Sequence, residues 1–169
     1  MTLGKVSQGA LLGLAFVIGL AACAGPSPTA TPTSTAAPAD PQADALTDYF
    51  AALHERRFED AVALYGGAYD VLQDMNPDVD PADHAALFER YCTQNGGVCL
   101  PLAAIVARGV AADGPALFTV HFANDDGSIF GQGPCCGEPD AGTRRTEFAF
   151  TVREIEGALR TMELPPYVP

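Results

Sequence analysis

Residues 117–122 read LFTVHF, and residues 146–153 read TEFAFTVR. Both stretches alternate large apolar residues with polar or smaller ones, which is the period-two pattern of a strand with one buried face. The alternation places two sets of side chains on one face each: Phe118, Val120 and Phe122 in the first stretch, and Phe148, Phe150 and Val152 in the second. Two such strands indicate an antiparallel sheet that covers a core on one side.

Further strands are expected on either side of this pair, over residues 102–108 (LAAIVAR) and 158–164 (ALRTMEL). Turn residues separate the four stretches: Asp113-Gly114, residues 125–127 and Glu156-Gly157. Aspartate and glycine favour the tight turns that join antiparallel strands. The second half of the chain is therefore predicted to be a meander of strands.

The part before the strands has a helical period instead. Apolar residues recur at i, i+3, i+4 and i+7 in two runs, namely Leu46, Tyr49, Phe50 and Leu53, then Phe58, Ala61, Val62 and Tyr65. This spacing predicts two amphipathic helices, the second of which ends at Gly66-Gly67. Helices followed by an antiparallel sheet make an α+β fold, in which the N-terminal helices pack on the sheet.

A third helix is predicted to start with Asp80 as its N-cap, Pro81 at its first position and Asp83 in its first turn. Aspartate accepts hydrogen bonds from free helical N–H groups, and proline suits a position whose N–H has no partner in the helix. The apolar stripe of this helix consists of His84, Leu87, Phe88 and Tyr91.

Charge and size exclude several classes of protein. The chain has 169 residues, 9 Lys+Arg and 21 Asp+Glu, for a formal net charge of −12. Such an acidic chain does not suit the neutralisation of phosphates, so we expect no nucleic-acid partner. The 48% of hydrophobic residues is too high for a wholly disordered chain, and the length allows one domain with appendages.

The first 22 residues are predicted to be a signal peptide. Lys5 precedes an apolar stretch over residues 10–22 (ALLGLAFVIGLAA), which is shorter than the about 20 residues of a membrane-spanning helix. Leu20-Ala21-Ala22-Cys23 resembles the lipobox of bacterial lipoproteins. The resemblance implies cleavage before Cys23, lipidation of the Cys23 thiol and export to the periplasmic or outer side of a membrane that the lipid holds. A transmembrane anchor and a signal cleaved without lipid are the alternatives.

Residues 23–42 are predicted to be the lipidated cysteine and a disordered linker. The run from residue 24 reads AGPSPTATPTSTAAPADPQ and contains no large apolar residue. It cannot bury enough surface to offset the entropy of ordering. The globular α+β domain is then expected over residues 43–169.

Within this domain, the paired opening helices are expected to end in Ala61-Val62-Ala63-Leu64-Tyr65, and the meander of strands is expected to close with Gly157-Ala158-Leu159-Arg160. On these features the domain resembles the nuclear transport factor 2-like (cystatin-like) superfamily. That resemblance implies a cone of helices against a curved antiparallel sheet. The superfamily includes isomerases, dehydratases, small-ligand binders and interaction modules, so the fold does not select a function.

Four cysteines remain beyond Cys23. An exported protein keeps disulfides, and the Asn95-Gly96-Gly97 turn favours a bond between Cys92 and Cys99. The second pair, Cys135 and Cys136, would then form a vicinal disulfide or stay free, and cross-links between the two pairs are the rival arrangement. Four thiols could also hold zinc or copper, but the spacing lacks the usual C-x-x-C pairs. We therefore expect no metal and no cofactor.

An acidic run, residues 74–80 (DMNPDVD), copies the first ligand positions of an EF-hand. Val79 stands where that loop needs glycine, and Ala85 stands where it needs glutamate, so a solvated loop is the preferred interpretation.

One residue pair raises the question of catalysis. His121 lies mid-strand on the face opposite Phe118 and Phe122, and with Glu147 it could act as a general base if that face lined a cavity. An outward-facing histidine on a half-polar strand is the plainer interpretation.

The functional expectation is a membrane-anchored, extracytoplasmic lipoprotein that acts as a non-catalytic binding or interaction module. The alternatives are a small-molecule enzyme with a cone pocket centred on His121 and a purely structural envelope lipoprotein. The glycine- and proline-rich loop over residues 131–142 is the candidate interaction surface, because loops commonly carry recognition.

Overall fold

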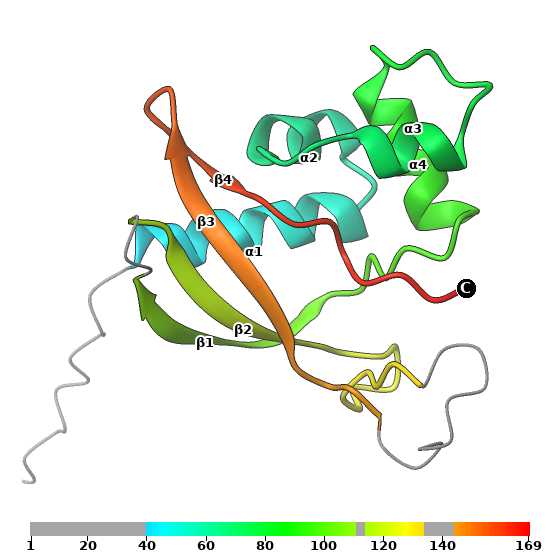
Figure 1. Ribbon diagram of the computed structural model, residues 1–169. Coiled ribbons are helices and arrows are strands. Elements are labelled where there is room, and N and C mark those ends of the chain that lie inside the picture. Colours follow the sequence, from blue (N-terminus) through cyan, green and yellow to red (C-terminus); the bar gives the residue numbers. More distant parts are fainter. Residues whose placement is uncertain (1–39, 111–113, 134–143) are drawn as a thin grey trace, which may run out of the picture. The chain divides into compact units, whose positions relative to one another are not determined.

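The computed structural model of the 169-residue chain describes residues 40–110, 114–133 and 144–169. All of these residues belong to one compact unit, Ala37–Pro169. In chain order they form helices and then a four-stranded antiparallel sheet, so the α+β prediction is confirmed (Figure 1). Within the described part of the chain, no helix is long and apolar enough to cross a membrane.

Four helices precede the sheet. They are α1 (Pro41–His54), α2 (Phe58–Leu64), α3 (Asp70–Met75) and α4 (His84–Thr93). The Asp40 side chain caps α1 by accepting from the Gln42 N–H at 3.0 Å, and Pro41 occupies the first position, where a missing N–H costs nothing. The predicted helices correspond to α1, α2 and α4, whereas α3 was not predicted because its six residues show too short a period to detect.

The predicted start of the third helix is wrong. α4 begins at His84, and its N-cap is Asp83, whose side chain accepts from the Ala86 N–H at 3.0 Å. Asp80 instead accepts from the Ala82 N–H at 2.9 Å and closes a separate turn before the helix. Both aspartates bond to nearby N–H groups, so either one satisfied the capping pattern from the sequence alone.

The sheet is a meander in the order β1–β2–β3–β4. Its strands are β1 (Leu102–Val110), β2 (Ala116–Phe122), β3 (Phe148–Ile155) and β4 (Ala158–Thr161). β3 and β4 are joined at Glu156 and Gly157, which both have positive φ (54° and 79°). Two such residues make the tight turn that matches the twist of a hairpin. β4 is shorter than predicted, because the chain leaves β3 after Thr161.

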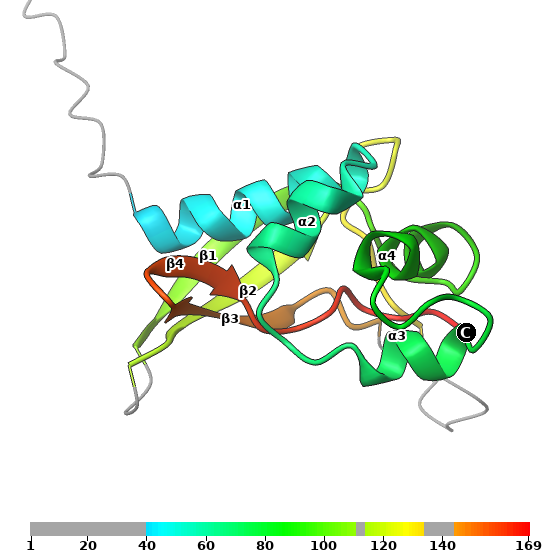
Figure 2. The ribbon, with the colours of Figure 1, turned by 90° about the horizontal axis from the view of Figure 1, so that it is seen from above.

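The core lies between α1 and the inner face of the sheet (Figures 1 and 2). Phe50 of α1 makes edge-to-face contacts with Phe122 of β2 at 5.0 Å and with Phe150 of β3 at 4.9 Å between ring centroids. The two predicted inward-facing sets are all buried: Phe118, Val120, Phe122, Phe148, Phe150 and Val152. Aromatic side chains thus fill the space between the helices and the sheet.

Candidate functional site

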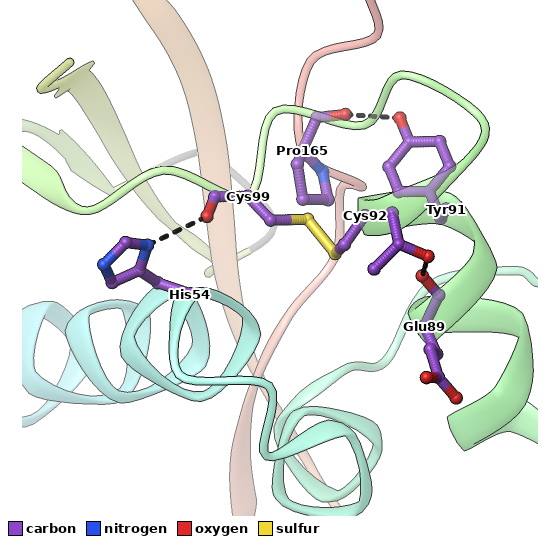
Figure 3. The surroundings of a disulfide bond; sticks show 7 residues. His54, Glu89, Tyr91, Cys92, Cys99 and Pro165 are labelled. Atoms are coloured by element: carbon purple, nitrogen blue, oxygen red, sulfur yellow. Dashed lines mark hydrogen bonds between the residues drawn. A yellow bond between two sulfur atoms is a disulfide. The ribbon is translucent and has the colours of Figure 1, made fainter. Parts of the chain in front are cut away.

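A disulfide joins Cys92, in the last turn of α4, to Cys99, so this predicted pairing is confirmed (Figure 3). The two Cα atoms are 5.5 Å apart, within the usual range for a disulfide. The Cys99 carbonyl also lies 3.2 Å from Nδ1 of His54, at the end of α1. The disulfide therefore closes a short loop, and Cys99 at the end of this loop contacts α1 through His54.

This loop, residues 92–99, holds the C-terminal segment of the chain. The Val98 N–H donates to the Pro166 carbonyl at 2.8 Å, and the Val168 N–H donates to the Gly96 carbonyl at 2.9 Å. The Tyr91 hydroxyl, just before the loop, donates to the Pro165 carbonyl at 2.7 Å (Figure 3). Three bonds thus fix residues 165–168 against α4 and the disulfide loop.

The fixed C-terminal segment forms one wall of a hollow of about 330 Å³ beside β3. The hollow is lined by Gln132, Arg145, Phe148, Ala149, Phe150, Leu164, Pro166 and Tyr167. A second hollow, of about 310 Å³, is lined by Arg108, Leu117, Phe118, Thr119, Ala149, Phe150, Thr151 and Glu163. Because both hollows share Ala149 and Phe150, we treat them as one depression and call it the β3 groove.

The groove exists because β4 ends early. The Met162 N–H still donates to the Thr151 carbonyl at 3.0 Å, but the Thr151 N–H donates to Oε2 of Glu163 at 2.7 Å instead of to a strand carbonyl. Pro165 and Pro166 follow, and they have no N–H with which to continue a ladder. The chain consequently diverges from β3 and leaves its edge open beside Ala149.

Two arginines border the groove. Nε of Arg145 donates to the Glu147 carbonyl at 3.0 Å, and its guanidinium carbon lies 5.0 Å from the centre of the Phe148 ring. Nε of Arg108 donates to Oγ1 of Thr119 at 2.8 Å, and its Nη2 lies 3.6 Å from Oε2 of Glu147. Arg108 is thus paired with a carboxylate, whereas Arg145 has no carboxylate partner among the described residues.

The structure places His121 on the outer face of β2, half buried and opposite the core-facing Phe122. It lines neither hollow of the β3 groove. Glu147 is exposed and pairs with Arg108, and no hydrogen bond or ion pair joins it to His121 within the described residues. The histidine and the glutamate are therefore not assembled as an acid–base pair.

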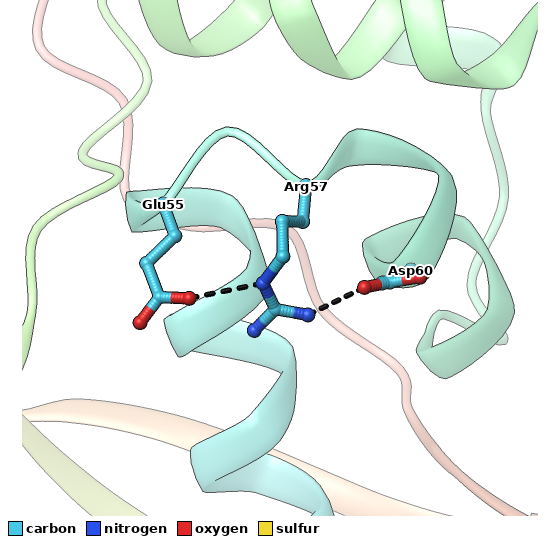
Figure 4. Close-up of polar contacts among 3 residues, drawn as sticks. All are labelled: Glu55, Arg57 and Asp60. Atoms are coloured by element: carbon cyan, nitrogen blue, oxygen red, sulfur yellow. Dashed lines mark hydrogen bonds and ion pairs between the residues drawn. The ribbon is translucent and has the colours of Figure 1, made fainter.

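A third hollow, of about 230 Å³, lies at the disulfide. Its lining residues are Leu53, His54, Arg56, Cys92, Thr93 and Cys99. Beyond it, Arg57 connects the ends of α1 and α2 by bonding to Glu55 at 2.9 Å and to Asp60 at 2.5 Å (Figure 4). These hydrogen bonds raise the pKa of Arg57, and they are exposed surface contacts.

Four tyrosines belong to the core or pack against it: Tyr49, Tyr65 and Tyr91 are buried, and Tyr69 is partly buried. Burial raises the pKa of Tyr69 and of Tyr91 to about 12 and raises those of Tyr49 and Tyr65 well above the ordinary value. Tyr65 donates to the Ala68 carbonyl at 2.9 Å, while the Tyr49 hydroxyl has no partner among the described residues. Each tyrosine therefore stays neutral at ordinary pH, and the four side chains contribute to the packing of the core.

The acidic run over residues 74–80 is partly neutralised. Arg90 of α4 binds Asp78 at 2.8 Å, and this hydrogen bond holds the pKa of Asp78 below its usual value. Asp80 bonds to the Ala82 N–H, as described above. Within residues 40–110, 114–133 and 144–169, no three acidic, histidine or cysteine side chains gather as metal ligands.

Several predicted features lie outside the described residues. They are the signal peptide, Cys23, the linker up to residue 39, the Cys135 and Cys136 pair, and residues 134–142 of the candidate interaction loop. Of that loop, Gln132 is described and lines the β3 groove. Comparisons with known proteins found no matching family model, no matching curated protein and no matching solved structure.

Proposed function

We propose that this protein is an exported bacterial lipoprotein whose folded part is a non-catalytic binding module. Support for the anchor comes from Lys5, the apolar stretch over residues 10–22 and the lipobox-like residues that end at Cys23. Because Asp40 caps α1 and residues 41 and 42 are helical, the predicted linker is shortened at its end, and residues 24–39 would tether the domain on the periplasmic or outer side of the membrane. Lipid has to supply the attachment, because a strongly acidic chain is repelled by anionic headgroups.

The domain is further proposed to have a nuclear transport factor 2-like fold. Support comes from the order of its elements, in which α1 and α2 precede an antiparallel meander, and from the packing of Phe50 on β2 and β3. Because this fold carries both enzymes and binding modules, the function has to be argued from the site.

The β3 groove is the proposed binding site, and its shape is the observation that carries this function. Two hollows of about 330 and 310 Å³ meet at Ala149, beside an open sheet edge and a wall that a disulfide loop holds in place. Ligand sites commonly measure about 300–1,000 Å³ and combine apolar walls with a few polar groups. The enzyme alternative draws no support from His121, which lines neither hollow.

The anchor is tested by replacing Cys23 with alanine. We expect the parent chain to fractionate with membranes and to incorporate a labelled fatty acid, and the Cys23→Ala chain to do neither. Replacing Ala22 with serine, which keeps the small residue before the cysteine, is the matched control and should retain both properties. A Cys23→Ala chain that stays on the membrane would contradict the lipid anchor.

The binding site is tested by photo-cross-linking in intact cells. A photoreactive amino acid replaces Tyr167, which lines the groove and is 41% exposed, and in a control chain it replaces Val71 of α3, which is 56% exposed and lines neither hollow. We expect a discrete adduct from position 167 and none from position 71. Equal labelling at the two positions would refute the groove as the binding site.

A further inference from the structure

The β3 groove has an open pair of main-chain groups at Ala149. In an antiparallel ladder the N–H and C=O groups of successive residues point to opposite sides of a strand. The Thr151 N–H and C=O bond to Glu163 and Met162, so they point away from β2. Ala149 lies two residues earlier in an unbroken register with β2, so its N–H and C=O point the same way. No described residue bonds to them there.

The molecule already places a carboxylate at this edge. Oε2 of Glu163 accepts the Thr151 N–H at 2.7 Å, and Oε1 accepts the hydroxyl of the same threonine. The next outward-pointing N–H along the edge is that of Ala149, which lines both hollows, whereas Glu163 lines only the second one. A second carboxylate can therefore occupy the equivalent position beside Ala149.

A positive charge lies at the matching end of the groove. Arg145 precedes β3 in the chain and lines the same hollow as Ala149. Its Nε is used by the Glu147 carbonyl, which leaves its terminal nitrogens without a described carboxylate partner. A chain that pairs antiparallel with β3 runs toward the Arg145 end, so its C-terminal carboxylate would arrive beside this guanidinium.

From these observations, and resting on the binding function proposed above, we propose that the β3 groove binds the carboxylate end of an N-acylated amino acid or peptide. The ligand carboxylate accepts from the Ala149 N–H and from Arg145, and the ligand amide N–H donates to the Ala149 carbonyl. The side chain of the ligand residue opposite Ala149 lies on the same face of the sheet as the side chains of Ala149 and Thr119, which line the second hollow. A free N-acylated amino acid and the C-terminus of a peptide share this chemistry, and the experiment below separates them.

The test measures binding to the full-length chain as purified, in detergent if it partitions with membranes. Three probes are titrated: N-acetyl-valine, N-acetyl-Ala-Ala-Val as the free acid, and the same tripeptide as its C-terminal amide. We expect the acids to bind and to shift the NMR signal of the Ala149 amide. We expect the amide to bind about tenfold more weakly, because a charge-assisted hydrogen bond is lost. A tripeptide acid that binds at least tenfold more tightly than N-acetyl-valine assigns the site to peptides, and equal binding assigns it to the free amino acid.

Two variants test the proposed contacts. Arg145→Gln should weaken binding of the tripeptide acid about tenfold, whereas Arg144→Gln, which changes an exposed neighbour that lines neither hollow, should leave it unchanged. Ala149→Pro removes an N–H that the β2 ladder does not use, besides fixing φ at this position, and it should weaken the same probe by a similar factor. If the Ala149→Pro chain fails to fold, the comparison of Arg145→Gln with Arg144→Gln still tests whether the site binds a carboxylate.

Failure of this inference is distinguishable from failure of the proposed function. Acid and amide probes that bind equally, or acid binding that survives Arg145→Gln, would overturn the carboxylate site. The carboxylate site would also be overturned if none of the three probes bound while the photoreactive residue at position 167 still gave its adduct. In that case the groove would remain the binding site. No probe binding and no adduct would refute both.

Discussion

Removal of the Cys92–Cys99 disulfide should cost about 2.5 kcal/mol of folding stability. The two cysteines are separated by seven positions. The chain-entropy relation for an eight-residue loop gives about 8 cal/mol/K, or about 2.5 kcal/mol at 25 °C. For a domain of this size, that loss lowers the Tm by about 10 °C.

The assay compares thermal and urea unfolding of the parent chain with those of the Cys92→Ser/Cys99→Ser double variant. The Cys135→Ser/Cys136→Ser chain is the matched control, because it removes two cysteines but keeps the bond that closes the 92–99 loop. We expect the control to unfold with the same free energy as the parent chain. We expect a reductant to destabilise the control but not the Cys92→Ser/Cys99→Ser chain, which has no disulfide between these positions to lose.

The same substitution should affect the β3 groove. The disulfide loop holds residues 165–168 through the Val98 and Gly96 bonds, and those residues form one wall of the groove. A photoreactive residue at position 167 should therefore give less adduct in the Cys92→Ser/Cys99→Ser chain. A double variant that unfolds within about 0.5 kcal/mol of the parent, with an unchanged adduct, would refute this reasoning.

Three further outcomes follow from the described contacts. Phe50→Ala should destabilise the domain by about 3–5 kcal/mol in urea unfolding, because it empties the space between α1 and two strands. Asp83→Ala should cost about 1 kcal/mol of stability and Asp80→Ala less, since only Asp83 caps α4; equal losses would argue against this helix start. Absorbance titration at alkaline pH should show Tyr69 and Tyr91 ionising near pH 12. The folded pKa values of these two tyrosines exceed the unfolded value of about 10. Their contribution to the stability of the fold is therefore complete below pH 10 and is lost as the pH rises through 12. Ionisation of both tyrosines near pH 10 in the folded protein would contradict their burial.

The fold was readable from the sequence where its periodicity was strong. The alternation around Val120 and Phe150 predicted both the central strands and their buried face, because one-sided burial requires period two. The i, i+3, i+4 spacing around Phe50 predicted α1 for the equivalent reason. The start of α4 was not readable, since Asp80 and Asp83 are both able to accept from N–H groups two or three residues ahead.

The candidate site was largely invisible in the sequence. Ala149 is an ordinary small residue on the solvent side of a strand, and its importance comes from the strand that is missing beside it. Pro165-Pro166 was the available signal, because two prolines cannot continue a ladder and so predict that the last strand stops early. The contact between the C-terminal segment and the disulfide loop joins residues about 70 positions apart, which no local pattern encodes.

At His121 the sequence suggested a site that the structure does not assemble. The residue type of His121 and its place on a strand suggested general-base chemistry, yet it lies on the outer face of β2 and lines neither hollow. Glu147, its suggested partner, pairs with Arg108 instead. A titratable residue type indicates a site only when the fold gives it a cavity and a partner.

The central claim, that the β3 groove is where this protein binds, is tested most directly by blocking the groove at Ala149. Photo-cross-linking from position 167 is repeated in an Ala149→Leu chain and in an Ala104→Leu chain, which adds the same bulk to an exposed position of β1 that lines neither hollow. The account predicts that Ala149→Leu abolishes the adduct and that Ala104→Leu preserves it. An adduct that persists at full yield in the Ala149→Leu chain would contradict the account.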